Sequence, residues 1–395
     1  MYTPFYIKGA ATILSAALLI FLTNTVSPDI LGRYFFILSI VLLLNSLLTN
    51  GLAKYLLRSL ASDSSVYKTI QIKGVITRVS FLVAGMSAAM WLITDSHWTA
   101  LVSFCLVPSV FIALSSSYLR ANGQLILGNF EGTIWRPTAS MILMAACVFL
   151  GQPLTPEVLI CILGLTLWVS AIALYFYLAF ELQMGSIRNY LNSREKVKSV
   201  IFLSLVGGYE FMLVNAESAA LGLVSSPEQV AIFKVCLIFK TLIMMPVIAA
   251  NMFLPYFMSS GNESELDLTR SLSFIGFLVG ALILGANFIF GEVVVVLLFG
   301  EAYTSVSELI NWFIIAVLGI SLFGGQPEKL VANYGESKYF VFGLVVLGFD
   351  LVLIFLLGPS MGAKIAVVNT AIATSCICIF ATYFNNQISN IKASL

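Results

Sequence analysis

Four charged side chains lie in two long apolar segments that flank one short polar turn. Glu210 and Glu217 precede the turn, and Lys234 and Lys240 follow it. With a rise of about 1.5 Å per residue in a helix, Glu217 and Lys234 lie at one depth below the turn. Glu210 and Lys240 lie at a second, greater depth. This matched spacing predicts two carboxylate–ammonium pairs across one helical hairpin.

These charged groups are suited to binding ions and anionic ligands. The two lysines could attract an anionic substrate, while the two glutamates neutralise them or bind a coupling proton or sodium ion. The alternative is a static set of salt bridges that holds the hairpin together. Asp350 lies in the middle of another apolar segment. It is either a further coupling carboxylate or an anchor for hydrogen bonds between helices.

A second group of basic residues lies nearer the ends of the apolar segments. It comprises Arg33, Lys54, Arg58 and Arg136. Long cationic side chains at such positions commonly extend to the membrane surface, which is the simpler interpretation. The alternative is a portal that draws an anionic headgroup into the protein, with these residues as additional substrate ligands.

No catalytic or metal centre is expected. His97 is the only histidine, and the six cysteines fall inside apolar stretches without the spacing of a zinc site. The formal net charge of +1 provides no strongly basic face for nucleic acid. We therefore expect neither enzyme activity, nor a metal or organic cofactor, nor a nucleic-acid partner.

The elements that carry these residues are predicted to be membrane helices. Hydrophobic residues make up 59% of the 395 and charged residues 10%, whereas soluble domains have about 45–50% and about 25%. An all-α integral membrane protein with about twelve spans is predicted. The segment from Val293 to Leu298 either prolongs the ninth span or caps it. The spans cover roughly residues 4–24, 34–56, 75–94, 99–120, 133–150, 157–181, 199–224, 230–257, 271–291, 305–325, 339–358 and 362–384.

Charge placement predicts the orientation of these spans. With the N-terminus inside, most of the 20 Lys and Arg residues lie on the cytoplasmic side, as the positive-inside rule requires. The first span is expected to remain uncleaved, because no convincing cleavage site follows it. We therefore expect a multi-pass protein of the bacterial cytoplasmic (inner) membrane, with both termini in the cytoplasm.

Two halves of the chain carry similar turn signals in the same order. Ser27-Pro28-Asp29 after the first span corresponds to Ser226-Pro227-Glu228 after the seventh. Asn122-Gly123 and Asn333-Tyr334-Gly335 correspond in the same way. A repeat of six helices predicts two similarly oriented lobes around a central cavity. The predicted parts are an N-terminal six-helix lobe at 1–182, a basic cytoplasmic linker at 183–198 and a C-terminal six-helix lobe at 199–395.

Several short motifs resemble those of Wzx-type flippases for O-antigen and polysaccharide repeat units. Leu31-Gly32-Arg33-Tyr34 resembles the Leu-Gly-x-Tyr motif of that family, and Glu217 to Glu228 resembles the end of its seventh helix. Glu217 stands where aspartate is commoner, and Val230-Ala231-Ile232-Phe233 replaces Val-Gly-x-Tyr. Further similar features are Pro246, Pro255, Ala332-Asn333-x-Gly335 and Gly358-x-x-x-Gly362-Ala363.

The resemblance is to the polysaccharide transporters of the multidrug/oligosaccharidyl-lipid/polysaccharide exporter (MOP) superfamily. It implies a flippase that moves an undecaprenyl-pyrophosphate-linked oligosaccharide to the outer leaflet by alternating access, as in O-antigen or lipopolysaccharide synthesis. The implied partners are that lipid-linked glycan, membrane lipids, and the polymerase and chain-length proteins of the same pathway. The alternatives are a cation-coupled multidrug antiporter of the same fold and a membrane glycan polymerase, which the short outer loops disfavour.

Overall fold

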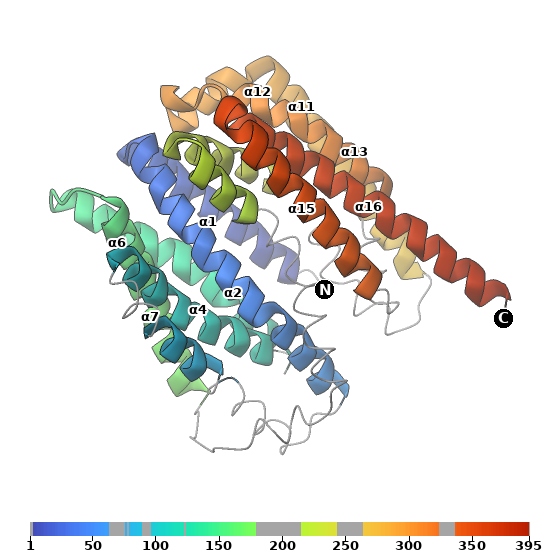
Figure 1. Cartoon of the computed structure of the whole chain (residues 1–395), viewed down its shortest axis with the longest axis horizontal. Coiled ribbons are helices and arrows are strands. Elements are labelled where there is room, and N and C mark those ends of the chain that lie inside the picture. Colours follow the sequence, from blue (N-terminus) through green and yellow to red (C-terminus); the bar gives the residue numbers. More distant parts are fainter. Residues whose placement is uncertain are drawn as a thin grey trace. The chain divides into compact units, whose positions relative to one another are not determined.

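The computed structural model describes residues 3–62, 76, 79–88, 96–121, 124–178, 215–242, 264–323 and 336–394. Within these ranges all regular structure is helical (Figure 1). Glu210, the predicted linker at 183–198 and the side chains of Lys54 and Arg58 lie outside the described part.

The N-terminal part of the described chain contains seven helices. They are α1 Thr3–Thr25, α2 Pro28–Ser62, residues 79–88, α4 His97–Ala121, α5 Leu125–Phe130, α6 Arg136–Phe149 and α7 Pro156–Tyr177. A π-helical turn, η1 Glu131–Trp135, joins α5 to α6 without a break. α7 begins where capping chemistry predicts, because the Thr155 side chain accepts a hydrogen bond from the Val158 backbone at 3.4 Å and proline follows at the first helical position.

The C-terminal part contains the remaining described helices. They are residues 215–224 and 227–242, α11 Ser264–Phe299, α12 Val306–Ile310, α13 Ile314–Phe323, α15 Glu336–Met361 and α16 Ala363–Ser394. Two short 3-10 turns, η2 Glu301–Tyr303 and η3 Asn311–Phe313, flank α12. α11 continues through Val293 and Leu298, so this segment prolongs the ninth span.

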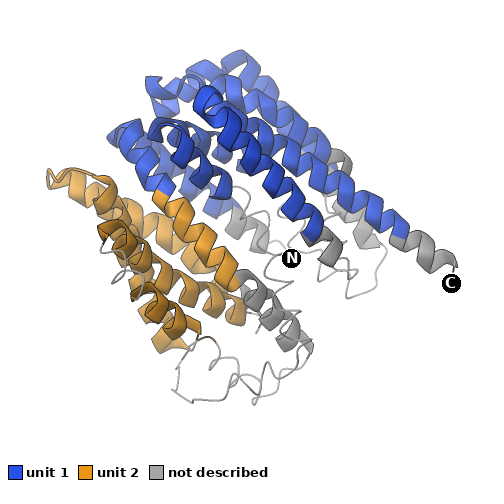
Figure 2. Cartoon of the chain, in the orientation of Figure 1, with its two compact units in different colours: residues 1–36, 216–395 blue, residues 37–215 orange. Residues whose placement is uncertain are grey.

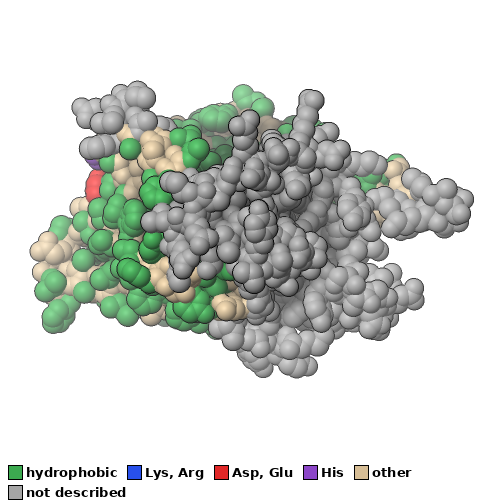
Figure 3. Space-filling model, turned by 90° about the horizontal axis from the view of Figure 1, so that it is seen from below, with side chains coloured by type: hydrophobic (Ala, Val, Ile, Leu, Met, Phe, Trp, Pro, Cys, Tyr) green, Lys and Arg blue, Asp and Glu red, His purple; other side chains and the backbone are tan. Residues whose placement is uncertain are grey.

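The helices have the length and surface of membrane spans. Among the described residues, seven are long and apolar enough to cross a bilayer: Pro28–Thr49, His97–Arg120, Pro156–Tyr177, Phe277–Phe299, Glu301–Gly319, Val341–Met361 and Ala363–Gln387. Large apolar side chains point outward, including Phe149, Phe288 and Leu297. In Figure 3 the described part of the surface is largely covered by apolar side chains. The chain is therefore a multi-pass membrane protein.

The chain divides into two compact units (Figure 2). Unit 1 contains residues 1–36 and 216–395, and unit 2 contains residues 37–215. The six-helix lobes at 1–182 and 199–395 stay a prediction. Unit 2 is organised around α4 and α7: Gly164 lies against the Phe104 ring, and the Trp168 indole donates to the Phe104 carbonyl at 3.0 Å. Such close contacts at small residues are typical of packed membrane helices.

Candidate functional site

The candidate site lies in unit 1 and is built around Glu217. This residue belongs to the helix at 215–224, and its side chain is fully buried. The Thr370 hydroxyl of α16 lies 2.5 Å from Glu217 Oε2 and 2.8 Å from the Ala366 carbonyl oxygen. A threonine hydroxyl has a single proton to donate. If Thr370 donates to Ala366, as threonine commonly does within a helix, a protonated Glu217 completes the arrangement by donating to Thr370.

Asp350 provides a second buried carboxyl group beside Glu217. It lies in α15, is only 3% exposed, and interacts electrostatically with Glu217. Asn369 of α16 donates to the Asp350 backbone carbonyl at 3.3 Å. Both Asp350 carboxyl oxygens and Glu217 Oε1 lack a hydrogen-bond donor among the described residues. The sequence predicted no partner for Asp350, whereas in the structure it interacts with Glu217.

The two acids favour binding of a positive species between them. Two carboxylates buried at close range repel each other, and burial without a donor adds a desolvation cost. A proton held by one of them, or a cation bound between them, removes both penalties. Their oxygen atoms, with the Thr370 hydroxyl, are hard donors of the kind that suit a proton or Na⁺. No group of three or more acidic, histidine or cysteine side chains suited to a metal ion occurs in the described ranges.

Two lysines of the helix at 227–242 complete the cluster electrostatically. Lys240 interacts with both Glu217 and Asp350, and Lys234 interacts with Glu217. Within the described residues, Lys234 makes no ion pair with Glu217, whose hydrogen-bond partner is Thr370. The pairing predicted from matched depth therefore becomes a cluster of two acids and two lysines. The other predicted pair, Glu210 with Lys240, falls partly outside the described residues.

The turns above the site are built from the two repeat-related motifs. The Ser-Pro-acidic sequence starts a helix at Pro28 and again at Pro227, because serine suits the N-cap and proline the first helical position. A Cβ at Gly32 would collide with the Pro227 carbonyl, so glycine permits the two turns to pack directly together. The Gln229 side chain accepts a hydrogen bond of 2.8 Å from Ala363 N, at the start of α16.

Two further predicted ligands, Arg33 and Arg136, pair with other carboxyl groups. Arg33 is exposed and pairs with Asp29, one helical turn earlier, at 3.0 Å. Arg136 lies in unit 2 and pairs with Glu131 at 3.1 Å. The sequence pattern did not single out Thr370, Asn369 or Glu131. The one feature of the sequence that could have indicated them is that they are polar residues in or beside apolar segments.

Comparisons with known proteins identify the fold. Neither a protein-family model nor a curated protein sequence matches the chain. Several solved structures do match it. An inward-facing multidrug resistance MATE family transporter of the MOP superfamily has a TM-score of 0.69 and 12% identity, covering 97% of this chain and 96% of that one.

Two further solved structures have the same architecture. The lipid II flippase MurJ, in an inward closed conformation, has a TM-score of 0.67 and 11% identity over 96% of this chain and 87% of its own. A MOP superfamily transporter from Pyrococcus furiosus, whose binding pocket is described as having reverse polarity, has a TM-score of 0.65 and 13% identity over 98% and 94%. The chain therefore has the all-helical transporter fold of about twelve helices, which confirms the predicted fold class.

Proposed function

We propose that this chain, with the fold of MOP-superfamily transporters, is a flippase of the bacterial cytoplasmic membrane. It moves undecaprenyl-pyrophosphate-linked oligosaccharide from the inner to the outer leaflet and is not an enzyme. The observation that carries the proposal is the cluster of the buried Glu217 and Asp350 with the half-buried Lys234 and Lys240. The motif resemblance to Wzx-type flippases and the fold shared with a lipid II flippase support the same substrate class.

The cluster suggests how ion and substrate binding are coupled. Two carboxylates and two ammonium groups balance to zero charge. A proton or Na⁺ bound at the acids leaves one positive charge in excess, which attracts the pyrophosphate. By thermodynamic reciprocity, a bound pyrophosphate strengthens ion binding to the same extent. Glu217 and Asp350 then act as coupling carboxylates, and Lys234 and Lys240 as substrate ligands.

Alanine substitution of the two lysines tests this function. In cells that lack the chromosomal copy, Lys240→Ala should abolish surface polysaccharide and cause lipid-linked repeat units to accumulate, at an unchanged protein level. Lys364→Ala is the matched control, because Lys364 is an exposed lysine near the Trp312 ring at 5.8 Å and outside the cluster. Full activity with alanine at both Lys234 and Lys240 would refute their role in substrate binding.

A cation-coupled multidrug antiporter is the second candidate. The buried carboxyl pair favours it, because carboxylates can bind an organic cation as well as a coupling ion. The structural match to a MATE multidrug transporter is compatible with it. Dye export that depends on Glu217 and Asp350, without any effect on glycan assembly, would support this candidate over the flippase.

A further inference from the structure

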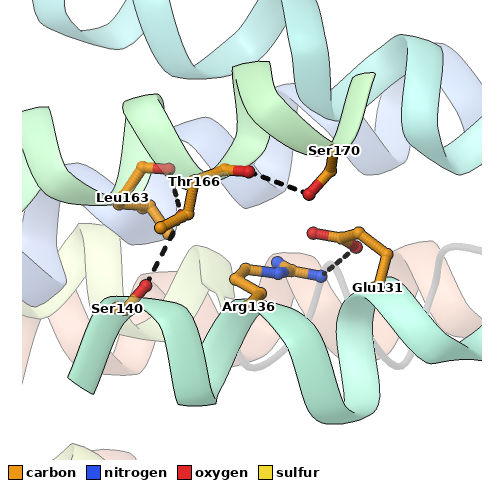
Figure 4. A network of polar contacts seen from close by, with 6 residues as sticks. All are labelled: Glu131, Arg136, Ser140, Leu163, Thr166 and Ser170. Carbon is orange, nitrogen blue, oxygen red and sulfur yellow. Dashed lines mark hydrogen bonds and ion pairs between the residues drawn. The ribbon is translucent and has the colours of Figure 1, made fainter. Parts of the chain in front are cut away.

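Unit 2 contains a second buried charge site, at the π-helical turn η1. The backbone N–H of Arg136 donates to the Glu131 carbonyl oxygen, which closes the wide turn. In an α-helix, residues five apart lie about 140° apart around the axis. The i→i+5 turn instead brings their side chains together. As a result, Arg136 Nη2 donates to Glu131 Oε2 at 3.1 Å (Figure 4).

This ion pair lies in the middle of a long helical stretch. The fifth span was predicted at 133–150, with Arg136 near its end, but the helix begins at Leu125 and continues to Phe149. The apolar part is Arg136–Phe149, as predicted, and the helix extends before it through the more polar residues 125–135. Arg136 therefore lies about 16 Å from one end and about 20 Å from the other. A partly buried ionisable pair inside a helix of a membrane protein is costly and is usually functional.

The pair uses only part of its hydrogen-bonding capacity. Glu131 Oε1 and Arg136 Nε are both buried and have no partner among the described residues. A guanidinium can grip an oxyanion through two parallel N–H groups, but Glu131 contacts only one of them. The Arg136 side chain is 31% exposed, whereas that of Glu131 is 9% exposed. The arginine is therefore the more exposed member of the pair, with its Nη2 occupied by Glu131 and its Nε buried.

The neighbouring side chains do not compete for the Arg136 guanidinium. Gly132 lies beside the guanidinium, and a Cβ there would be 3.0 Å from Nη2, so a larger residue would crowd the arginine. The Ser170 hydroxyl on the facing helix α7 donates to the Thr166 carbonyl at 2.8 Å, and Thr166 donates to the Leu163 carbonyl at 2.7 Å. Figure 4 shows these hydroxyls hydrogen-bonded within α7, opposite the ion pair.

We infer that Glu131 is an exchangeable counter-ion and that Arg136 binds a phosphate-type oxyanion of the substrate through Nε and Nη2. A phosphate oxyanion is not tethered to the helix, so it can orient to accept from both N–H groups. The Glu131 carboxylate accepts from Nη2 only. Binding then replaces Glu131 at the guanidinium. This inference rests on the proposed function and assigns a pyrophosphate-binding role within unit 2.

The decisive test is whether two substitutions to a neutral residue raise or lower the affinity for undecaprenyl pyrophosphate. The full chain is placed in lipid nanodiscs, and its affinity for undecaprenyl pyrophosphate is measured with inorganic pyrophosphate as competitor. Glu131→Gln removes the competing charge and should raise the affinity about 2- to 5-fold. Arg136→Gln should lower it about 10-fold or more. The double variant should bind like Arg136→Gln, because the Glu131 counter-ion has no effect on binding once the arginine is gone.

Two further variants control for charge and for folding. Arg120→Gln also removes a positive charge from unit 2. Because Arg120 already has hydrogen-bond partners in Ser116 and Ser117, its replacement should change the affinity less than 2-fold. Arg136→Lys keeps the charge without the planar fork and should lie between wild type and Arg136→Gln. If Arg136→Gln does not fold, the Glu131→Gln and Arg136→Lys results still decide.

The result also separates this inference from the proposed function. A lower or unchanged affinity in Glu131→Gln overturns the counter-ion role, even if cells without the protein accumulate lipid-linked repeat units. A raised affinity in Glu131→Gln, with normal glycan assembly in cells that lack the protein, keeps the oxyanion site and refutes the flippase.

Discussion

Replacing Thr370 by valine removes one hydroxyl from the carboxyl site while nearly keeping the shape of the side chain. The Thr370 hydroxyl is the hydrogen-bond partner of Glu217 Oε2 at 2.5 Å, and Glu217 Oε1 already lacks one. The substitution therefore leaves both oxygens of a fully buried carboxyl group without a partner. This is the most direct perturbation of the site that leaves every charged residue in place.

The expected cost follows from burial. Leaving a buried polar group unsatisfied costs about 1–3 kcal/mol of unfolding free energy. Thr374 provides a matched control, since its hydroxyl donates to the Thr370 carbonyl at 2.7 Å and contacts no carboxyl group. Thr374→Val should be close to neutral, because its hydroxyl only bonds back to the carbonyl one turn earlier in the same helix. The difference between the two variants measures the Glu217 contact.

Equilibrium unfolding in mixed micelles measures both free energies, and a double-mutant cycle isolates the contact. Combining Thr370→Val with Glu217→Gln should give a coupling energy of about 1 kcal/mol. The Na⁺ and proton dependence of stability should weaken in Thr370→Val and persist in Thr374→Val. Equal costs for the two valine variants, together with simple additivity in the cycle, would show that Thr370 does not support the carboxyl site.

Four further outcomes are expected. Gly32→Ala should destabilise the protein by about 1–3 kcal/mol, because its methyl group meets the Pro227 carbonyl. Gly85→Ala, whose Cβ would point into open space, should be neutral or stabilising in the same unfolding assay. Gly362→Ala should cost about 1–2 kcal/mol, since its φ of +55° is unfavourable for alanine, and thermal unfolding should reveal the loss. Asp350→Asn should remove the dependence of transport on an imposed proton or sodium gradient, measured in vesicles; unchanged gradient dependence would exclude Asp350 from coupling.

Much of the fold was predictable because apolar periodicity and length dominate in a membrane chain. The spans followed from apolar runs and polar breaks, and the repeated Ser-Pro-acidic motif marked the helix starts at Pro28 and Pro227. Residues on adjacent helices at equal distance from a turn are neighbours, and Glu217 and Lys234 do interact electrostatically, but the predicted ion pair is not formed among the described residues. Charged residues inside spans were thus the most informative feature of the sequence.

The partners of these charges were less predictable, because they depend on which helices are adjacent. Sequence spacing gives depth along one helix, but it does not reveal that α15 and α16 bring Asp350 and Thr370 to Glu217. The Glu131–Arg136 pair was missed for a different reason. Five residues is the wrong spacing for an α-helix, and the π turn that makes it favourable has no clear sequence signal.

Two separate bonds fasten the same helical hairpin to α16. Gln229 binds the first residue of α16, Ala363, and Glu217 binds Thr370, about 10 Å further along. Attachment at two points restricts rotation of one element relative to the other, so we expect the hairpin and α16 to move together. We therefore expect a displacement of Glu217 on ion binding to be transmitted to the turn at Gln229. A spectroscopic label on that turn would then report, from the water-exposed end, whether the acids are occupied.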